Sequence, residues 1–183
     1  MADTIQLQDK VFRVMIPAEK ISEAVENVAA QLNERYKGRT PVFLGVLSGS
    51  FLFLSDLVRK IEFDNRVAFV KLSSYDGTQS TGEVKQHLGV DFDIEGQDII
   101  IVEDIVDTGL TMHKMLETLE EKKPASLAVA SLFLKPARLR VPVEVKYSAF
   151  EIPDRFIVGY GLDYDELYRN LPYVGILKRE VYE

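Results

Sequence analysis

Residues 99–111 restrict the fold most, because an apolar run there ends at two adjacent carboxylates and is followed by a loop of small residues. The apolar part, Ile99 to Val102, is typical of a strand buried on both faces, and a helix is expected over Met112 to Glu121. Glu103 and Asp104 would then lie at the carboxyl end of that strand. Since ligands bind at this edge of open α/β sheets, the segment predicts a binding site there.

The loop from Asp107 to Thr111 has the composition of a phosphate site. Gly109 lets the backbone approach a ligand closely, Thr108 and Thr111 supply hydroxyl donors, and the free amides of the next helix attract an anion. An isolated Asp-Thr-Gly triplet is more often a simple helix cap. The two carboxylates before the loop change that balance, because they repel one another unless they meet hydroxyls, a cation or water. A ribose diol or Mg²⁺ would satisfy them.

The rest of the chain alternates the patterns of buried strands and amphipathic helices. Strands are expected over Val11 to Met15, Val42 to Leu47, Arg66 to Leu72 and Ser126 to Leu134, and helices from Pro17 to near Gly38 and over Ser50 to Ile61. This alternation predicts an α/β fold with a central parallel sheet flanked by helices. Shorter strands, expected over Val145 to Ala149, Phe156 to Gly159 and Tyr173 to Leu177, would form a small hood beside that sheet.

Length and composition bound these expectations. A chain of 183 residues, 46% of them hydrophobic, is long enough for one full core and short for two, so residues 1–183 are expected to form a single domain. The net charge of -7 argues against a nucleic-acid partner, and the absence of cysteine excludes disulfides and thiolate metal sites. No apolar run has membrane-spanning length and the polar start is unlike a signal peptide, so a soluble cytoplasmic protein without a membrane partner is expected.

A second strand-to-helix turn, Leu47-Ser48-Gly49-Ser50, is a further candidate phosphate site. It follows a buried strand, so its amides would lie at the same sheet edge, and Gly49 permits an unusual backbone there. Taken alone, Ser-Gly-Ser is more often a plain turn.

Three separated segments carry a resemblance to a known family. Residues 99–111 resemble the phosphoribosyl pyrophosphate signature of the type I phosphoribosyltransferases. Ser73-Ser74-Tyr75, followed by Gln79-Ser80-Thr81-Gly82, resembles the catalytic loop of hypoxanthine-guanine phosphoribosyltransferases, and Ile152 to Asp163 resembles their purine-binding segment. The segments occur in the family's order, and the likeness extends from about Val11 to Leu177.

The resemblance implies a purine salvage enzyme with the type I phosphoribosyltransferase fold. Such an enzyme transfers the 5-phosphoribosyl group from phosphoribosyl pyrophosphate to hypoxanthine, and also to guanine, giving purine nucleoside monophosphate and pyrophosphate. It implies that Glu103 and Asp104 hold the ribose hydroxyls directly or through Mg²⁺. It also implies that Asp107 is the general base for the purine N7 proton and that Lys135 donates to the purine O6, which favours 6-oxopurines over adenine.

The remaining predicted contacts also come from the resemblance. The turn at Ser48 and Gly49 would bind pyrophosphate, often through a cis peptide that here joins Leu47 to Ser48, and Ser48 and Leu110 stand where relatives often carry basic residues. The other residues carried over are Ser74, Tyr75 and Arg169 near pyrophosphate, Phe156 stacked on the base, Ile157 offering its backbone to the purine edge, and Asp163 as a metal ligand. Without the family pattern, Lys135 would be a solvated strand-end lysine, Phe156 a core residue and Arg169 a surface ion-pair partner.

Two other classes of function fit parts of the sequence. A phosphoribosyltransferase fold can serve as a non-catalytic regulator that senses phosphoribosyl pyrophosphate, although the acidic composition opposes control of nucleic acid. A phospho-accepting signalling domain also uses carboxylates at strand ends, but it does not explain the Thr-Gly-x-Thr loop. The preference among hypoxanthine, guanine and xanthine stays open, and relatives commonly form homodimers or homotetramers.

Overall fold

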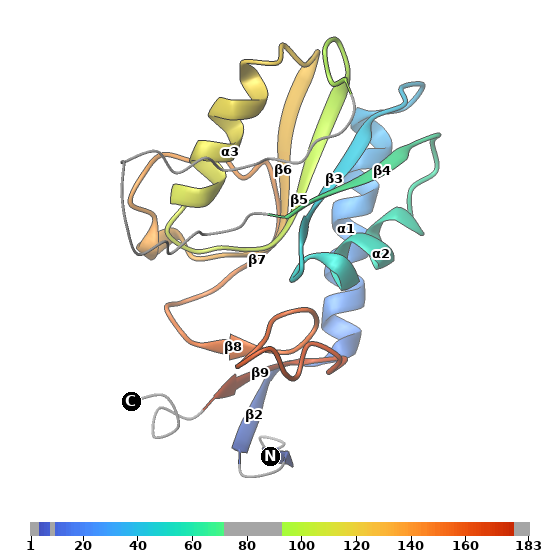
Figure 1. Cartoon of the computed structure of the whole chain (residues 1–183). Coiled ribbons are helices and arrows are strands. Elements are labelled where there is room, and N and C mark those ends of the chain that lie inside the picture. Colours follow the sequence, from blue (N-terminus) through green and yellow to red (C-terminus); the bar gives the residue numbers. More distant parts are fainter. Residues whose placement is uncertain (1–3, 8–9, 72–92, 178–183) are drawn as a thin grey trace.

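The main sheet has five parallel strands. The computed structural model describes residues 4–7, 10–71 and 93–177 of the chain. The sheet has the order β4-β3-β5-β6-β7 (Figure 1). Its strands are β3 (Val42–Leu47), β4 (Arg66–Lys71), β5 (Asp98–Val106), β6 (Ser126–Leu134) and β7 (Tyr147–Glu151).

Helices cover both faces of this sheet (Figure 1). Helices α1 (Ala18–Arg35) and α2 (Phe51–Val58) pack on one face, and α3 (Leu110–Glu120) packs on the other. Successive side chains of a strand point to opposite faces, so Ile100 and Val102 of β5 join the α1 and α2 layer while Ile99 and Ile101 join the α3 layer. Burial on both faces explains the continuous apolar run in β5.

A second, antiparallel sheet lies beyond the carboxyl ends of the main strands (Figure 1). It contains β1 (Thr4–Leu7), β2 (Lys10–Ile16), β8 (Ile157–Val158) and β9 (Val174–Leu177), in the order β1-β2-β9-β8. This sheet is the expected hood. Two of its strands come from the C-terminal part of the chain, and the N-terminal segment supplies the other two.

The strand expected over Val145 to Ala149 was wrongly assigned to the hood. It forms β7, which pairs in parallel with β6 at the edge of the main sheet. The intervening segment contains only one 3₁₀ turn, Pro136–Arg138, yet residues 135–146 are long enough to return the chain for a parallel crossover.

Element boundaries otherwise follow the sequence patterns closely. Strands β3 and β6 have the predicted bounds, α2 is shorter than the predicted helix over Ser50 to Ile61, and α3 begins earlier than predicted, at Leu110. Gly109 caps α3 in the left-handed region, at φ +78°, which explains why a glycine precedes the helix. None of the helices in the described ranges combines the length and apolar character needed to cross a membrane.

Candidate active site

Two turns meet at the carboxyl edge of the main sheet. The β3–α2 turn contains Gly49, and a Cβ added to Gly49 would overlap the carboxylate of Asp104 near the end of β5. The Leu47–Ser48 peptide is cis, as the family resemblance implies. Ser50 is buried, and its hydroxyl donates to the Val46 carbonyl oxygen at 2.7 Å, which ties the turn to β3. The two predicted phosphate and ribose elements therefore lie in direct contact.

Glu103 and Asp104 form a pair of partly buried carboxyl groups. Glu103 Oε1 accepts the Asp104 N–H at 3.1 Å, and Asp104 Oδ1 accepts the Ile105 N–H at 2.8 Å. Burial raises the pKa of Glu103 well above its usual range, and repulsion from Asp104 raises it further. Burial also raises the pKa of Asp104, although hydrogen bonds with Glu103 and from Ile105 oppose this effect. Such a pair favours a cation or hydroxyl donors beside it.

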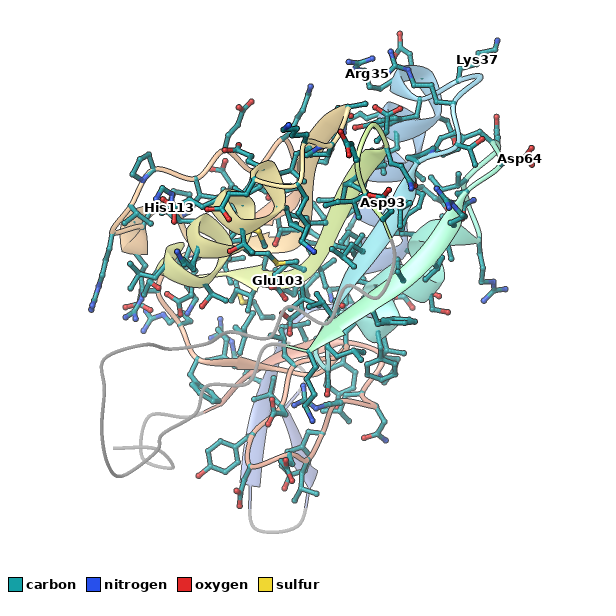
Figure 2. All side chains as sticks on the ribbon, turned by 45° about the horizontal axis from the view of Figure 1, so that its top comes forward. Arg35, Lys37, Asp64, Asp93, Glu103 and His113 are labelled. Carbon is teal, nitrogen blue, oxygen red and sulfur yellow. The ribbon has the colours of Figure 1, made fainter. Side chains whose placement is uncertain are left out.

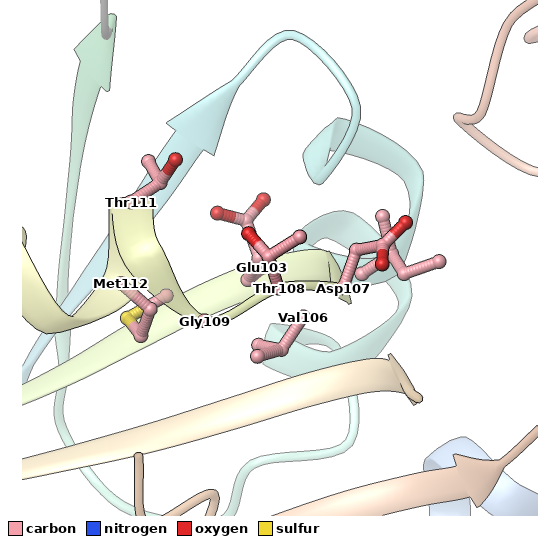
Figure 3. A pocket seen from close by; sticks show the side chains of 8 residues that line it. Glu103, Val106, Asp107, Thr108, Gly109, Thr111 and Met112 are labelled. Atoms are coloured by element: carbon pink, nitrogen blue, oxygen red, sulfur yellow. The ribbon is translucent and has the colours of Figure 1, made fainter. Parts of the chain in front are cut away.

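The loop after β5 surrounds a hollow of about 110 Å³ (Figure 3). The predicted phosphate-loop residues Thr108, Gly109 and Thr111 line it together with Glu103 and Asp107, and the remaining lining residues are Ile105, Val106 and Met112. Leu110, the remaining residue of the predicted loop, is exposed and lies at the start of α3. The hollow is therefore lined by carboxylates, by hydroxyls and by the N-terminus of α3.

Asp107 lies in an ion-pair cluster that sequence reasoning did not anticipate. Lys135 Nζ lies 3.2 Å from Asp107 Oδ2, and Arg138 Nε donates to Asp107 Oδ1 at 2.6 Å. Asp154 completes the cluster, 3.5 Å from Lys135 Nζ and 3.1 Å from Arg138 Nη1. The hydrogen bond from Arg138 holds the pKa of Asp154 below its usual value, with a smaller contribution from Lys135. The predicted residues Asp107 and Lys135 are thus in contact.

The purine-segment residues 159–161 form a left-handed turn that packs on the β3–α2 turn. The φ angles of Gly159, Tyr160 and Gly161 are +105°, +48° and +99°. A Cβ on Gly161 would overlap the Gly49 carbonyl oxygen, so only glycine permits this approach. Tyr160 donates its hydroxyl to Asp56 of α2 at 2.6 Å, and burial together with this contact raises the pKa of Tyr160. The turn thereby fixes the small sheet against the main one.

Arg169 and Asp163 lie beside this turn. Arg169 Nη1 donates to the Gly161 carbonyl oxygen at 2.7 Å, and its Nη2 lies 2.8 Å from Asp163 Oδ1. The Asp163 carboxylate also accepts the Glu166 N–H at 2.9 Å. Arg169 is close enough to Asp104 to lower the pKa of that carboxyl group, although burial has the larger, opposite effect. Arg169 thus connects the purine segment with the carboxylate pair.

The carboxylates predicted as metal ligands do not gather into one cluster. Within the described ranges there is no group of three or more histidine, aspartate or glutamate side chains able to hold a common ion. Glu103 and Asp104 are adjacent, whereas Asp163 is paired with Arg169. Asp163 is therefore held apart from the Glu103 and Asp104 pair, and its role as a metal ligand stays a prediction.

Phe156 and Ile157 differ in exposure. Phe156 is 39% exposed, so it is not a core residue, and its ring makes an edge-to-face contact with Tyr164 at a centroid distance of 5.9 Å. Ile157 is buried at the start of β8. Ser74 and Tyr75 lie outside the described residues.

Glu103 lies at the end of the main sheet that faces the small sheet, whereas Arg35 and Asp64 lie at the opposite end (Figure 2).

Sequence reasoning missed Arg138, Asp154, Tyr160 and Asp56. The only available signal was that Arg138 follows Lys135 by one helical turn and that Asp154 and Tyr160 lie in the purine segment.

Comparison with known proteins gives a consistent result. The family model described as phosphoribosyl transferase domain matches residues 17–165. A hypoxanthine-guanine phosphoribosyltransferase of Staphylococcus aureus (strain Mu50) is 45% identical to this chain, and the match covers 92% of this chain and 95% of the relative. One from Streptococcus pneumoniae (strain R6) is 41% identical, and the match covers 96% of this chain and 98% of the relative. The crystal structure of a hypoxanthine phosphoribosyltransferase from Staphylococcus aureus superposes with a TM-score of 0.86 at 44% identity, covering 93% of each chain. The chain belongs to the phosphoribosyltransferase family.

Proposed function

We propose that this protein transfers the 5-phosphoribosyl group from phosphoribosyl pyrophosphate to hypoxanthine and guanine, giving the nucleoside monophosphate and pyrophosphate. The observation that carries this proposal is the 3.2 Å contact between Asp107 Oδ2 and Lys135 Nζ beside the predicted phosphate hollow. A 6-oxopurine presents N7 and O6 side by side on one edge. The Asp107 carboxylate can accept a hydrogen bond from the purine N7–H while the Lys135 ammonium donates one to O6. Adenine has an amino group in place of O6, and that group cannot accept a hydrogen bond from Lys135.

The co-substrate would lie across the elements that meet at the sheet edge. The 5′-phosphate would bind in the hollow at Thr108, Gly109 and Thr111, with Leu110 contributing backbone only. The ribose would lie over Glu103 and Asp104, whose pKa values are raised by burial and, for Glu103, also by repulsion from Asp104. The turn at Ser48 and Gly49 and the guanidinium of Arg169 would hold the pyrophosphate. Ser74 and Tyr75 stay predicted contacts to the same group.

The base would be oriented by the purine segment. Phe156 would stack on the purine ring, because its ring is exposed beside the site, and the backbone of Ile157 would face the purine edge. Lys135 would turn from Asp107 toward the purine O6. That movement would leave Asp107 Oδ2 for the N7 proton.

The reaction is a displacement at C1 of the ribose. The purine N9 forms a bond to C1, the bond from C1 to pyrophosphate breaks, and its electron pair leaves with pyrophosphate. Asp107 takes the N7 proton as N9 becomes nucleophilic. Glu103 and Asp104 lie where positive charge develops on the ribose, so in their ionised form they stabilise the transition state.

Oxygen ligands at Glu103 and Asp104 fit Mg²⁺. This ion usually takes one or two protein carboxylates and fills its other positions with water and phosphate oxygens, so two adjacent carboxylates suffice. Bound Mg²⁺ supplies neutralisation of the departing pyrophosphate. Asp163 would be a ligand of a separate ion, after its carboxylate leaves Arg169.

We further propose that residues 1–183 work as one domain, in the cytoplasm, and as a homodimer or homotetramer. The family match over residues 17–165 and the alignment along most of both relatives support the single domain. The reading as a non-catalytic sensor has no support among these relatives, whose names are those of enzymes.

The experiment is purine-dependent pyrophosphate release by the purified protein, with and without Mg²⁺. Hypoxanthine, guanine, xanthine and adenine are compared in competition, which also establishes the preferred base. We expect turnover with hypoxanthine and guanine, none with adenine and loss of turnover when Mg²⁺ is chelated. Binding of phosphoribosyl pyrophosphate without turnover on any 6-oxopurine would instead identify a sensor.

A further inference from the structure

Arg138 spans the two carboxylates of the cluster around the proposed base. Its Nε donates to Asp107 Oδ1 at 2.6 Å, while its Nη1 donates to Asp154 Oδ2 at 3.1 Å. Lys135 approaches the other oxygen of each carboxylate, Asp107 Oδ2 at 3.2 Å and Asp154 Oδ1 at 3.5 Å. The four side chains therefore close a ring in which positive and negative groups alternate and both oxygens of Asp107 are held.

The backbone fixes this ring to the end of the main sheet. The Lys135 N–H donates to the Val106 carbonyl oxygen at 3.0 Å, directly before Asp107. The Arg138 N–H donates to the Lys135 carbonyl oxygen at 3.0 Å within the turn Pro136–Arg138. Since proline restricts the backbone at the start of this turn, Lys135 and Arg138 are held at a fixed separation beside Asp107.

Stability alone does not account for the ring. The side chains of Arg138 and Asp154 are 37% and 54% exposed, and exposed ion pairs contribute little to stability. The Lys135 side chain, in contrast, is only 8% exposed and has two carboxylates beside its ammonium. A lysine that must leave Asp107 for a substrate oxygen would remove one of the two contacts that hold that carboxylate.

Building on the function proposed above, we propose that Arg138 is a positioning residue for Asp107 and that Asp154 anchors Arg138. The Arg138 Nε holds Asp107 Oδ1, so that Oδ2 keeps its orientation when Lys135 turns to the purine. Asp154 holds the far side of the guanidinium and balances its charge. Arg138 itself makes no contact with the purine in this arrangement.

The test compares Arg138→Met, Arg138→Lys and Asp154→Asn with the unmodified protein, by steady-state kinetics of pyrophosphate release. Arg59→Met is the matched control, because Arg59 is exposed, lies at the end of α2 outside the proposed site and has no ion pair with any other described residue. We expect Arg138→Met to lower kcat about 10- to 100-fold, the scale for a reacting group displaced by about an ångström. The KM for phosphoribosyl pyrophosphate should change less than about twofold, because the substitution disturbs only Asp107, the proposed general base.

A double variant distinguishes positioning from a general structural effect. In an Asp107→Asn background, Arg138→Met should cause little further loss, because the group that Arg138 positions no longer acts as a base. Arg138→Lys should restore only part of kcat, since one ammonium cannot donate from two separate nitrogens as the guanidinium does. Asp154→Asn should lower kcat less than Arg138→Met, and it provides a second measurement if Arg138→Met folds poorly.

If the unmodified protein is active, three results would overturn this inference alone. One is that Arg138→Met behaves like Arg59→Met. Another is an equal loss from Arg138→Met with and without Asp107, and the third is a rise in the KM for phosphoribosyl pyrophosphate alone, which would make Arg138 a co-substrate contact. Absence of turnover by the unmodified protein would overturn the proposed function and this inference with it. The two failures are distinguishable, because the results above require an unmodified protein that is active.

Discussion

Gly49 and Asp104 approach so closely that a methyl group on the Gly49 α-carbon would overlap the Asp104 carboxylate. The first belongs to the β3–α2 turn and the second lies near the end of β5, and the two strands are neighbours in the main sheet. On the other side, the Gly49 carbonyl oxygen lies against Gly161. Gly49 is therefore enclosed between the carboxylate pair and the purine segment, and no side chain larger than hydrogen fits there.

Substitution of Gly49 should damage activity more than stability. In Gly49→Ala the added methyl group displaces Asp104, and we expect kcat/KM for phosphoribosyl pyrophosphate to fall about 100-fold, the scale for an ångström of misplacement. Gly38→Ala is the control: nothing lies within 4 Å of its added Cβ, but its φ of +74° is strained for alanine. The control should lower Tm with unchanged kinetics. Equal kinetics for Gly49→Ala and Gly38→Ala would contradict the proposed co-substrate placement.

Removal of the charge of Asp107 should affect the chemical step. We expect Asp107→Asn to lower kcat about 10²- to 10⁴-fold, the usual contribution of a general base, because the amide cannot accept the N7 proton. The affinity for phosphoribosyl pyrophosphate, measured by calorimetry, should stay nearly unchanged. An equal loss of co-substrate affinity would reassign Asp107 to binding.

Removal of the Lys135 ammonium should weaken discrimination among purines. Lys135→Met keeps much of the side-chain volume, but it cannot donate to O6, so kcat/KM for hypoxanthine should fall while adenine stays a poor substrate. Competition kinetics with hypoxanthine and adenine would measure the ratio. Lys114→Met, at an exposed lysine of α3, is the matched control. An unchanged ratio in Lys135→Met would exclude Lys135 from recognition of the base.

The pH dependence of stability should reflect Glu103. Because the pKa of Glu103 is raised in the folded protein, this carboxyl group stays protonated there at pH values at which it ionises in the unfolded chain, above the ordinary glutamate pKa of roughly 4.3. Stability is therefore lost as pH rises from that value through the raised pKa. We expect Glu103→Gln to raise Tm by about 2–4 °C at pH 7 and by much less at pH 4, as measured by calorimetry without Mg²⁺.

Glu117→Gln, on the exposed surface of α3, is the control for this measurement and should show no such dependence on pH. A lower Tm for Glu103→Gln at neutral pH would mean that the ionised carboxylate is stabilised in the fold, contrary to the raised pKa.

Local patterns were enough to predict much of the fold. The bounds of β3 and β6 were predicted because a continuous apolar run is an adequate signal for a strand buried on both faces. The order of strands and helices was sufficient for a parallel sheet with helices on both faces, and it placed Glu103 and Asp104 at the carboxyl edge. The place of β7 was not predicted, because a short strand has no local feature that selects its neighbour.

The amino-acid sequence by itself determined the chemical groups of the candidate site and the strand-to-loop-to-helix segments that carry them. Only the tertiary structure decided the partners of those groups: Gly49 against Asp104 and Gly161, and Asp107 beside Lys135 and Arg138. The physical reason is that periodicity and turn composition act over a few neighbouring residues. A contact between side chains on separate elements depends instead on how the strands pair and the layers pack.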